Sequence, residues 1–310
     1  MAHNLITIND LSFEDVEKIF DLTRDLKNSP EGYRKMFRGR SFGLIFEKPS
    51  TRTWVSFEAG IFGLGGAAIY LGPQDIQLGK REELKDVARV LGRYLEACVL
   101  RTFSHTTITD FAKYFGRPVV NGLSDLEHPC QVVGDFFTIC ERFPDDANPK
   151  IVFIGDGNNV LNSLICLTAL LGAKLHYATP KKYEPSSKIL QEALVVAKRT
   201  GGEIKAFHDP VAAVEKADVV YTDVWVSMGE ENVAAEKIKA FQDFQLNKKL
   251  MKHAKKDALV MHCLPAHRGQ EITDEVIEGP NSVVFEQAEN RLHVQKAILL
   301  HLCDRDKESA

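Results

Sequence analysis

The segment EKPSTRTW at residues 47–54 gathers hydroxyl and guanidinium groups at the start of a predicted helix. Because a strand pattern precedes it and helical spacing follows, the first-turn N–H groups of that helix lack intrahelical acceptors. The same turn carries the side chains of Ser50, Thr51, Arg52 and Thr53. Together these donors could bind a phosphate group. Taken alone, such a motif is more often a simple helix cap followed by a solvent-facing arginine.

Two further strand ends in the first half carry groups that could hold a carbonyl. Arg101 ends the predicted strand 97–101, a position from which an arginine usually extends to solvent. His128 and Gln131 open the helix after the next strand, and Pro129 restricts His128 to an extended backbone. An imidazole can polarise a carbonyl, and an amide can both donate and accept. For His128 alone, a ligand-free role at the helix start is an equally good interpretation.

The second half presents amide, carboxylate, hydroxyl and thiol groups where its predicted strands end. These residues are Asn159, Asp223, Ser227, Met228 and Cys263. A carboxylate at such a position could bind an ammonium group, although helix capping is a common role for Asp. The first half is therefore suited to a phosphate and a carbonyl, and the second half to an amino acid. This combination indicates a transferase with two substrates.

Two other kinds of site are disfavoured. The segment GDGNNV at 155–160 is similar to a dinucleotide-binding turn, but Val160 replaces the third glycine. No ribose-binding carboxylate lies about 20 residues further on. His262, Cys263 and His267 share one strand and loop, and one Cys with two His does not complete a tetrahedral zinc site. We therefore expect no cofactor and no metal.

Composition limits the class of protein. The chain has 310 residues and a net charge of -4, a length that favours two domains and a balance without the basic surplus of nucleic-acid or membrane-surface binders. None of its six cysteines forms a C-x-x-C pair, which is typical of reduced thiols in a cytoplasmic protein. The first ten residues show no signal-peptide pattern, and the longest apolar stretch is too short to span a bilayer.

The elements that must position these residues follow an alternating pattern. Strand patterns occur at 41–47, 67–71, 97–101, 118–121, 150–155, 174–178, 203–207, 218–223, 258–262 and 282–285. Helical spacing occurs at 51–64, 82–94, 106–115, 160–171, 187–199 and 211–217. This density of alternation predicts an α/β fold with two doubly wound parallel sheets, linked by helices that also cover both faces.

The polar, proline-bracketed stretch at 142–149 is the best candidate for a domain boundary. We expect a first domain of residues 1–145 and a second of residues 146–287. The closing helix, within residues 288–310, is expected to return to the first domain. Ligands of open parallel sheets bind beyond the carboxyl ends of the strands, so the site residues should gather there.

Four ordered motifs resemble the aspartate/ornithine carbamoyltransferase family. They are S-T-R-T at 50–53, H-P-C-Q at 128–131, D-V-W-V-S-M-G at 223–229 and H-C-L-P at 262–265. The first two are common to both branches of the family, whereas the last two are typical of the ornithine branch. The resemblance implies transfer of a carbamoyl group from carbamoyl phosphate to L-ornithine, giving citrulline and phosphate without a metal or cofactor. Such a step belongs to arginine biosynthesis or a urea-cycle-type route.

The resemblance also implies roles for the matching residues. Those that would bind carbamoyl phosphate are Ser50, Thr51, Arg52, Thr53, Gln77, Arg101, His128, Gln131, Cys263, Leu264 and Arg291. Those with catalytic roles would be Arg52, Arg101, His128 and Cys263. Ornithine would be bound by Asn159, Asp223, Ser227 and Met228, with Asp223 pairing the α-ammonium group. Family members are usually trimers or multiples of trimers, in which Gln77 would reach the neighbour's carbamoyl phosphate.

Two positions depart from the family pattern. Trp54 stands where the residue after S-T-R-T is normally arginine, which removes one positive charge from the first helical turn. We expect Trp54 to have a packing role, with substrate identity unchanged and weaker carbamoyl phosphate binding as the risk. Arg81 replaces a glycine that relatives usually carry, which bears on the conformation of the intersubunit loop.

Two alternatives are left open by the sequence. The chain could carbamoylate an acylated ornithine or another amine, although an intact S-M-G loop with Asp223 favours a free α-amino group. It could also be a catalytically silent relative that serves as a binding or regulatory subunit, although the joint presence of Arg52, Arg101 and His128 favours activity.

Overall fold

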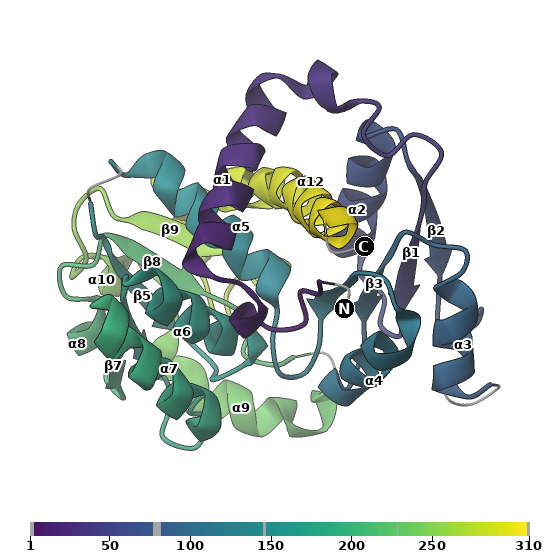
Figure 1. Cartoon of the computed structure of the whole chain (residues 1–310). Coiled ribbons are helices and arrows are strands. Elements are labelled where there is room, and N and C mark those ends of the chain that lie inside the picture. Colours follow the sequence, from purple (N-terminus) through teal and green to yellow (C-terminus); the bar gives the residue numbers. More distant parts are fainter. Residues whose placement is uncertain (1–2, 77–81, 145–146, 228, 309–310) are drawn as a thin grey trace. The chain divides into compact units, whose positions relative to one another are not determined.

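The computed structural model describes residues 3–76, 82–144, 147–227 and 229–308, and it divides into two compact units (Figure 1). The first unit comprises residues 1–137 and 290–310, and the second comprises residues 138–289. Two helices, α5 (Pro129–Arg142) and α12 (Val284–Glu308), run from one unit into the other. The division lies within α5, N-terminal to the polar stretch at which the sequence predicts a boundary. In the described residues, no helix has the length and apolar character needed to cross a membrane.

The first unit is built on a four-stranded sheet in which all neighbouring strands are parallel. Its order is β2-β1-β3-β4, with β1 (Ser41–Phe46), β2 (Ala67–Leu71), β3 (Ala97–Arg101) and β4 (Val119–Leu123). The strand order reverses between β1 and β3, and the register places Phe46 opposite Arg101. This is the position at which open α/β sheets bind ligands. The residues that follow β1 therefore lie beside the end of β3.

Helices pack around this sheet. They are α1 (Phe13–Asn28), α2 (Thr51–Gly63), α3 (Leu84–Leu91), α4 (His105–Phe115) and the adjoining parts of α5 and α12, with short 3₁₀ turns at Ile8–Asp10 and Pro30–Tyr33. Figure 1 shows α12, in yellow, alongside the purple helix α1. His301 Nε2 lies 3.1 Å from Asp15 Oδ1, and Lys27 Nζ donates to Asn290 Oδ1 at 2.7 Å. The prediction that the closing helix returns to the first domain is confirmed.

The second unit is built on a five-stranded parallel sheet of order β7-β6-β5-β8-β9. Its strands are β5 (Lys150–Ile154), β6 (Lys174–Ala178), β7 (Glu203–Phe207), β8 (Val219–Thr222) and β9 (Leu259–His262). Its helices are α6 (Asn159–Leu171), α7 (Ser187–Thr200), α8 (Pro210–Val214), α9 (Ala234–Phe241), α10 (Lys248–Met251) and α11 (Asp274–Ile277), with 3₁₀ turns at Glu231–Val233 and Gln242–Phe244. Here the order reverses between β5 and β8, where Ile154 lies opposite Thr222.

The predicted fold class, two doubly wound parallel sheets with flanking helices, is confirmed, and nine of the ten strand patterns correspond to strands. The strand predicted at 282–285 is wrong. Ser282 forms only an isolated bridge to Val260, and α12 begins at Val284. Val283 and Val284 are both buried, and a short apolar run of this kind does not distinguish a strand from the buried start of a helix.

Candidate active site

The turn after β1 forms an anion cradle. The Ser50 hydroxyl makes no capping hydrogen bond with α2 and instead donates to Thr53 Oγ1 at 2.9 Å. Thr51 and Arg52 are exposed at the helix start, whereas Thr53 is buried. The first-turn N–H groups of α2 are therefore available to donate to a ligand, and the helix dipole adds positive potential at the same end. These donors are suited to an anion, and phosphate binding by them stays a prediction.

Arg291 completes this cradle from the other end of the chain. Its side chain is buried, with Nη1 donating to Gln131 Oε1 at 3.0 Å and Nη2 donating to Thr53 Oγ1. Gln131 Nε2 in turn donates to Asp135 Oδ1 at 2.8 Å. Thr53 Oγ1 accepts from both Ser50 and Arg291, so its own hydroxyl hydrogen remains as a donor. The network fixes four of the predicted carbamoyl phosphate residues relative to one another.

His128 and Arg101 are buried in the same unit, at 4% and 5% exposure. Burial holds the pKa of His128 well below its usual range, and the positive charges of Arg291, Arg101 and Arg52 lower it further. The imidazole is therefore neutral at physiological pH. A neutral imidazole and a guanidinium are both suited to donating hydrogen bonds to an oxygen on which negative charge develops.

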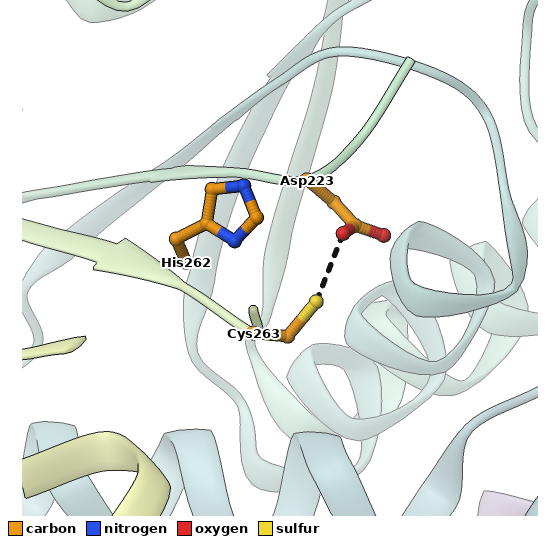
Figure 2. A group of neighbouring side chains, drawn as sticks. All are labelled: Asp223, His262 and Cys263. Atoms are coloured by element: carbon orange, nitrogen blue, oxygen red, sulfur yellow. Dashed lines mark hydrogen bonds between the residues drawn. The ribbon is translucent and has the colours of Figure 1, made fainter. Parts of the chain in front are cut away.

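In the second unit, Asp223 is held by two donors at the carboxyl ends of the strands. Asn158 Nδ2 donates to Asp223 Oδ2 at 2.7 Å, and the Cys263 thiol donates to Oδ1 at 2.9 Å (Figure 2). The Asn158 side chain also caps α6, accepting from the amides of Val160 and Leu161. Asp223 is 6% exposed, and these two donors, an amide and a thiol, are neutral. Neither donor brings a positive charge to Asp223, so a cationic ligand would be its first cationic partner among these contacts.

His262 supports the H-C-L-P loop. Its Nδ1 accepts from the Leu264 amide at 2.8 Å, which places its proton on Nε2, and Nε2 lies 3.0 Å from Glu271 Oε1. Both side chains are fully buried. Leu264 has a positive φ of 56°, a conformation that costs energy in a non-glycine residue and must be held by its surroundings. We infer that the His262–Glu271 pair holds it.

The ligand atoms of Asp223, His262 and Cys263 all lie within 4.8 Å of one another (Figure 2). Both ring nitrogens of His262 nevertheless have partners within the protein, and a metal would have to displace one of them. The geometry favours a structural role for this histidine. The absence of a metal remains a prediction.

Trp54 has the packing role expected of it. Its ring stacks on Tyr70 of β2, with centroids 4.4 Å apart and planes at 26°. Such pairs contribute about 0.5–1.5 kcal/mol beyond the burial of their area. The aromatic ring thus joins α2 to β2 at the position that would otherwise carry a positive charge.

Hydrogen bonds link Asp223 to Cys263 in the second unit, and in the first unit they link four predicted site residues, Ser50, Thr53, Gln131 and Arg291. Gln77, Arg81 and Met228 lie outside the described residues. Asn159 is the first residue of α6, and Ser227 is partly buried in the loop after β8. The sequence analysis did not identify Asn158 as a site residue, although it contacts Asp223 directly. Its signal in the sequence was an amide at a helix start directly after a strand.

Parallel α/β units with an anion cradle in one and a buried carboxylate in the other define a group-transfer enzyme class with a phosphorylated and a cationic substrate. Family comparisons match this division. Residues 3–141 match the carbamoyl-P binding domain of aspartate/ornithine carbamoyltransferases, and residues 147–302 match the Asp/Orn binding domain. The chain belongs to the aspartate/ornithine carbamoyltransferase family.

Individual relatives resemble the chain over nearly its whole length. It is 49% identical to the ornithine carbamoyltransferase of Thermococcus kodakarensis over 300 residues, which cover 96% of this chain and 95% of that protein. The structure is similar to ornithine carbamoyltransferase from Pyrococcus furiosus, with a TM-score of 0.92, 48% identity and 96% of each chain covered. It is also similar to the anabolic enzyme from Campylobacter jejuni, with a TM-score of 0.94, 42% identity and coverage of 98% and 100%.

The depressed pKa of His128 predicts how the stability of the folded protein depends on pH. An unfolded histidine has a pKa near 6.5, so below about pH 6.5 the unfolded chain binds a proton that the folded chain does not. The free energy of unfolding should therefore decrease as the pH is lowered below about 6.5, by up to about 1.4 kcal/mol per pH unit from this residue. In His128→Gln, the drop in Tm between pH 7 and pH 5.5 should be smaller than in the unsubstituted protein.

His253→Gln is the matched control, because the His253 side chain is exposed. It should retain the original pH dependence of Tm. Parallel Tm–pH curves for the unsubstituted protein and His128→Gln would contradict the assignment of a buried, neutral imidazole.

Proposed function

We propose that this chain transfers the carbamoyl group of carbamoyl phosphate to the δ-amine of L-ornithine, giving L-citrulline and phosphate as a step of arginine biosynthesis. The observation that carries the proposal is the buried Arg291–Gln131–Thr53 network beside the cradle of α2. Thr53 and Gln131 lie in the part of the chain that matches a carbamoyl-P binding domain, and Arg291 belongs to the same compact unit. The choice of ornithine as the acceptor substrate rests on the relatives, which are ornithine carbamoyltransferases.

Carbamoyl phosphate is assigned to the first unit. Arg52, Arg291 and the first-turn amides of α2 offset the charge of the phosphate, while hydroxyl groups complete its hydrogen bonds. Those hydroxyls belong to Ser50, Thr51 and Thr53. Gln131 and the backbone of Cys263 and Leu264 contact the carbamoyl end. This division places the strongest positive potential on the group that leaves.

Carbonyl activation is assigned to Arg101 and His128. As the nitrogen attacks, negative charge develops on the carbonyl oxygen, and both side chains donate hydrogen bonds to it. A buried neutral imidazole does not exchange protons readily near pH 7, so His128 polarises the carbonyl without acting as the base. The C–N bond then forms, the C–O bond to phosphate breaks, and the leaving charge stays beside Arg52.

Ornithine is assigned to the second unit. The Asp223 carboxylate pairs with the α-ammonium group, and the α-carboxylate is bound by Asn159, Ser227 and Met228. The δ-ammonium group, with a lysine-like pKa near 10.4, must lose a proton before it attacks. That first proton passes to water. Attack by the neutral amine leaves a second proton to be lost from the nitrogen, and we assign this second proton to the departing phosphate, which leaves as hydrogen phosphate.

Oligomer and location are further parts of the proposal. We propose a homotrimer or a multiple of trimers in which Gln77 completes the neighbour's site, and a cytoplasmic location. The six cysteines are free thiols, as expected in a reducing compartment. The proposed partners are the two substrates, with no nucleic acid and no membrane.

Arg52→Ala should abolish most of the activity. Loss of one charge-assisted donor to the transition state typically costs about 10²–10³-fold in rate, so kcat/KM for carbamoyl phosphate should fall by that order. Citrulline formation from both substrates measures it. Arg38→Ala, which removes another exposed arginine of the first unit, should retain full activity. Equal citrulline formation by the two variants would contradict the assigned role of Arg52. Absence of citrulline formation in the unsubstituted protein would exclude the assigned reaction and favour a silent binding subunit.

Substrate choice tests the role of Asp223. N-acetylornithine keeps the δ-amine but has no α-ammonium group, so kcat/KM should fall on the order of 10²-fold or more relative to ornithine, because a buried charge loses its partner. Asp223→Asn should reduce the use of ornithine and shrink this preference. Equal rates with the two amines would instead identify an enzyme that acts on acylated ornithine.

A further inference from the structure

Lys237 of α9 is a buried cation that the proposed reaction does not use. Its side chain is 5% exposed, and its ammonium group lies 2.7 Å from Asp156 Oδ2 and 2.6 Å from Glu230 Oε2. Lysine is almost never fully buried without a partner, because removing its charge from water is costly. Burial opposes the charge here, but the hydrogen bonds and charges of the two carboxylates outweigh it and raise the pKa of Lys237. The ammonium group is therefore charged.

The two carboxylates belong to two different loops of the ornithine site. Asp156 lies in the turn between β5 and α6, two residues before Asn158, which contacts Asp223. Glu230 follows the S-M-G motif, and its Oε2 also accepts from the Ser227 amide at 3.0 Å. The Glu230 amide donates back to the Ser227 carbonyl at 3.1 Å. Lys237 thus ties the loop that carries Ser227 to the loop that carries Asn158 and Asn159.

The same contacts set the charge of the site. Burial raises the pKa of Asp156 to about 6, hydrogen bonding and charge from Lys237 lower it, and the charges of Glu230 and Asp223 raise it. Three carboxylates therefore lie close together, and Lys237 directly pairs with two of them. Asp223, by contrast, is contacted by Asn158 and the Cys263 thiol, which are neutral donors. The lysine offsets the two carboxylates that would repel the α-carboxylate of an amino acid and leaves Asp223 to attract its ammonium group.

We propose that Lys237 is a positioning residue for the amino-acid substrate: it holds the Ser227 loop against the Asn158–Asn159 turn so that both charged α-groups are bound together. The inference rests on the proposed function and deepens it. Lys237 acts through Asp156 and Glu230, because its own ammonium group is enclosed between them. Its contribution should therefore concern ornithine and leave carbamoyl phosphate unaffected.

Lys237→Met should raise the KM for ornithine by tenfold or more while the KM for carbamoyl phosphate stays within twofold. Glu230→Gln keeps an oxygen for the Ser227 amide but loses the charge, so the KM for ornithine should rise by a smaller factor. Lys237→Arg should restore most of the affinity. Lys239→Met, which removes an exposed lysine of the same helix, is the matched control and should leave both KM values unchanged.

Inhibition by L-norvaline, which has both α-groups and no δ-amine, gives a readout of binding separate from the transfer step. Its inhibition constant should rise in parallel with the KM for ornithine. In the Lys237→Met/Glu230→Gln double variant, the effects should be less than multiplicative, because both changes break one tether. If Lys237→Met does not fold, Glu230→Gln and Lys237→Arg carry the test.

An unchanged KM for ornithine in folded Lys237→Met, or in Glu230→Gln where Lys237→Met does not fold, would overturn the inference. An equal rise in both KM values would also overturn it, because it would indicate a general loss of structure. Failure of the unsubstituted protein to form citrulline would instead overturn the proposed function, so the two failures are distinguishable.

Discussion

The first unit depends on one buried guanidinium. Arg291 lies 160 residues after Gln131 and 238 residues after Thr53, and it donates to both. A buried arginine is tolerated only where its donors have acceptors, so the position of α12 on α2 and α5 is coupled to the geometry of the phosphate cradle. The neighbouring Asn290 and the more distant His301 add contacts with α1. The closing helix thus contributes a side chain directly to the candidate anion site.

The second unit has the same kind of sheet topology, but the charged residue at its strand ends is a carboxylate. Each sheet reverses its strand order at one point, and the residues after the two strands that flank that point carry the site. At β1 and β3 these are the Ser50–Thr53 turn and Arg101, whereas at β5 and β8 they are Asn158 and Asp223. The first set is suited to an anion and the second to a cation. A net charge of -4 describes neither, because the charges that matter are few and buried.

Local features of the fold could be predicted from the sequence. The runs at 174–178 and 203–207 are strands with the predicted bounds, because β-branched and aromatic residues between turn signals specify them locally. The strand predicted at 282–285 failed because its apolar residues belong to the start of α12, where packing decides the conformation. Helices α1, α9, α10 and α11 were not predicted.

The candidate site residues were identified from residue types at strand ends and from family resemblance, but the side-chain pairings among them were not predicted. Lys237 pairs with Asp156 across 81 residues, and Asn158 pairs with Asp223 across 65. No spacing rule connects residues so far apart. From the sequence alone, a lysine on an amphipathic helix is therefore interpreted as a solvent-exposed charge. Only its burial and its contacts with Asp156 and Glu230 in the folded chain show that Lys237 is enclosed.

The most direct test of the account is the affinity for phosphonoacetamide, a stable isostere of carbamoyl phosphate, measured by calorimetry for the unsubstituted protein and Arg291→Lys. A lysine keeps the charge but cannot donate to Gln131 and Thr53 in the planar arrangement of a guanidinium. The account predicts a dissociation constant at least tenfold higher in Arg291→Lys, with Arg38→Lys unchanged. Equal affinities for the unsubstituted protein and Arg291→Lys would contradict the central role of the Arg291 network.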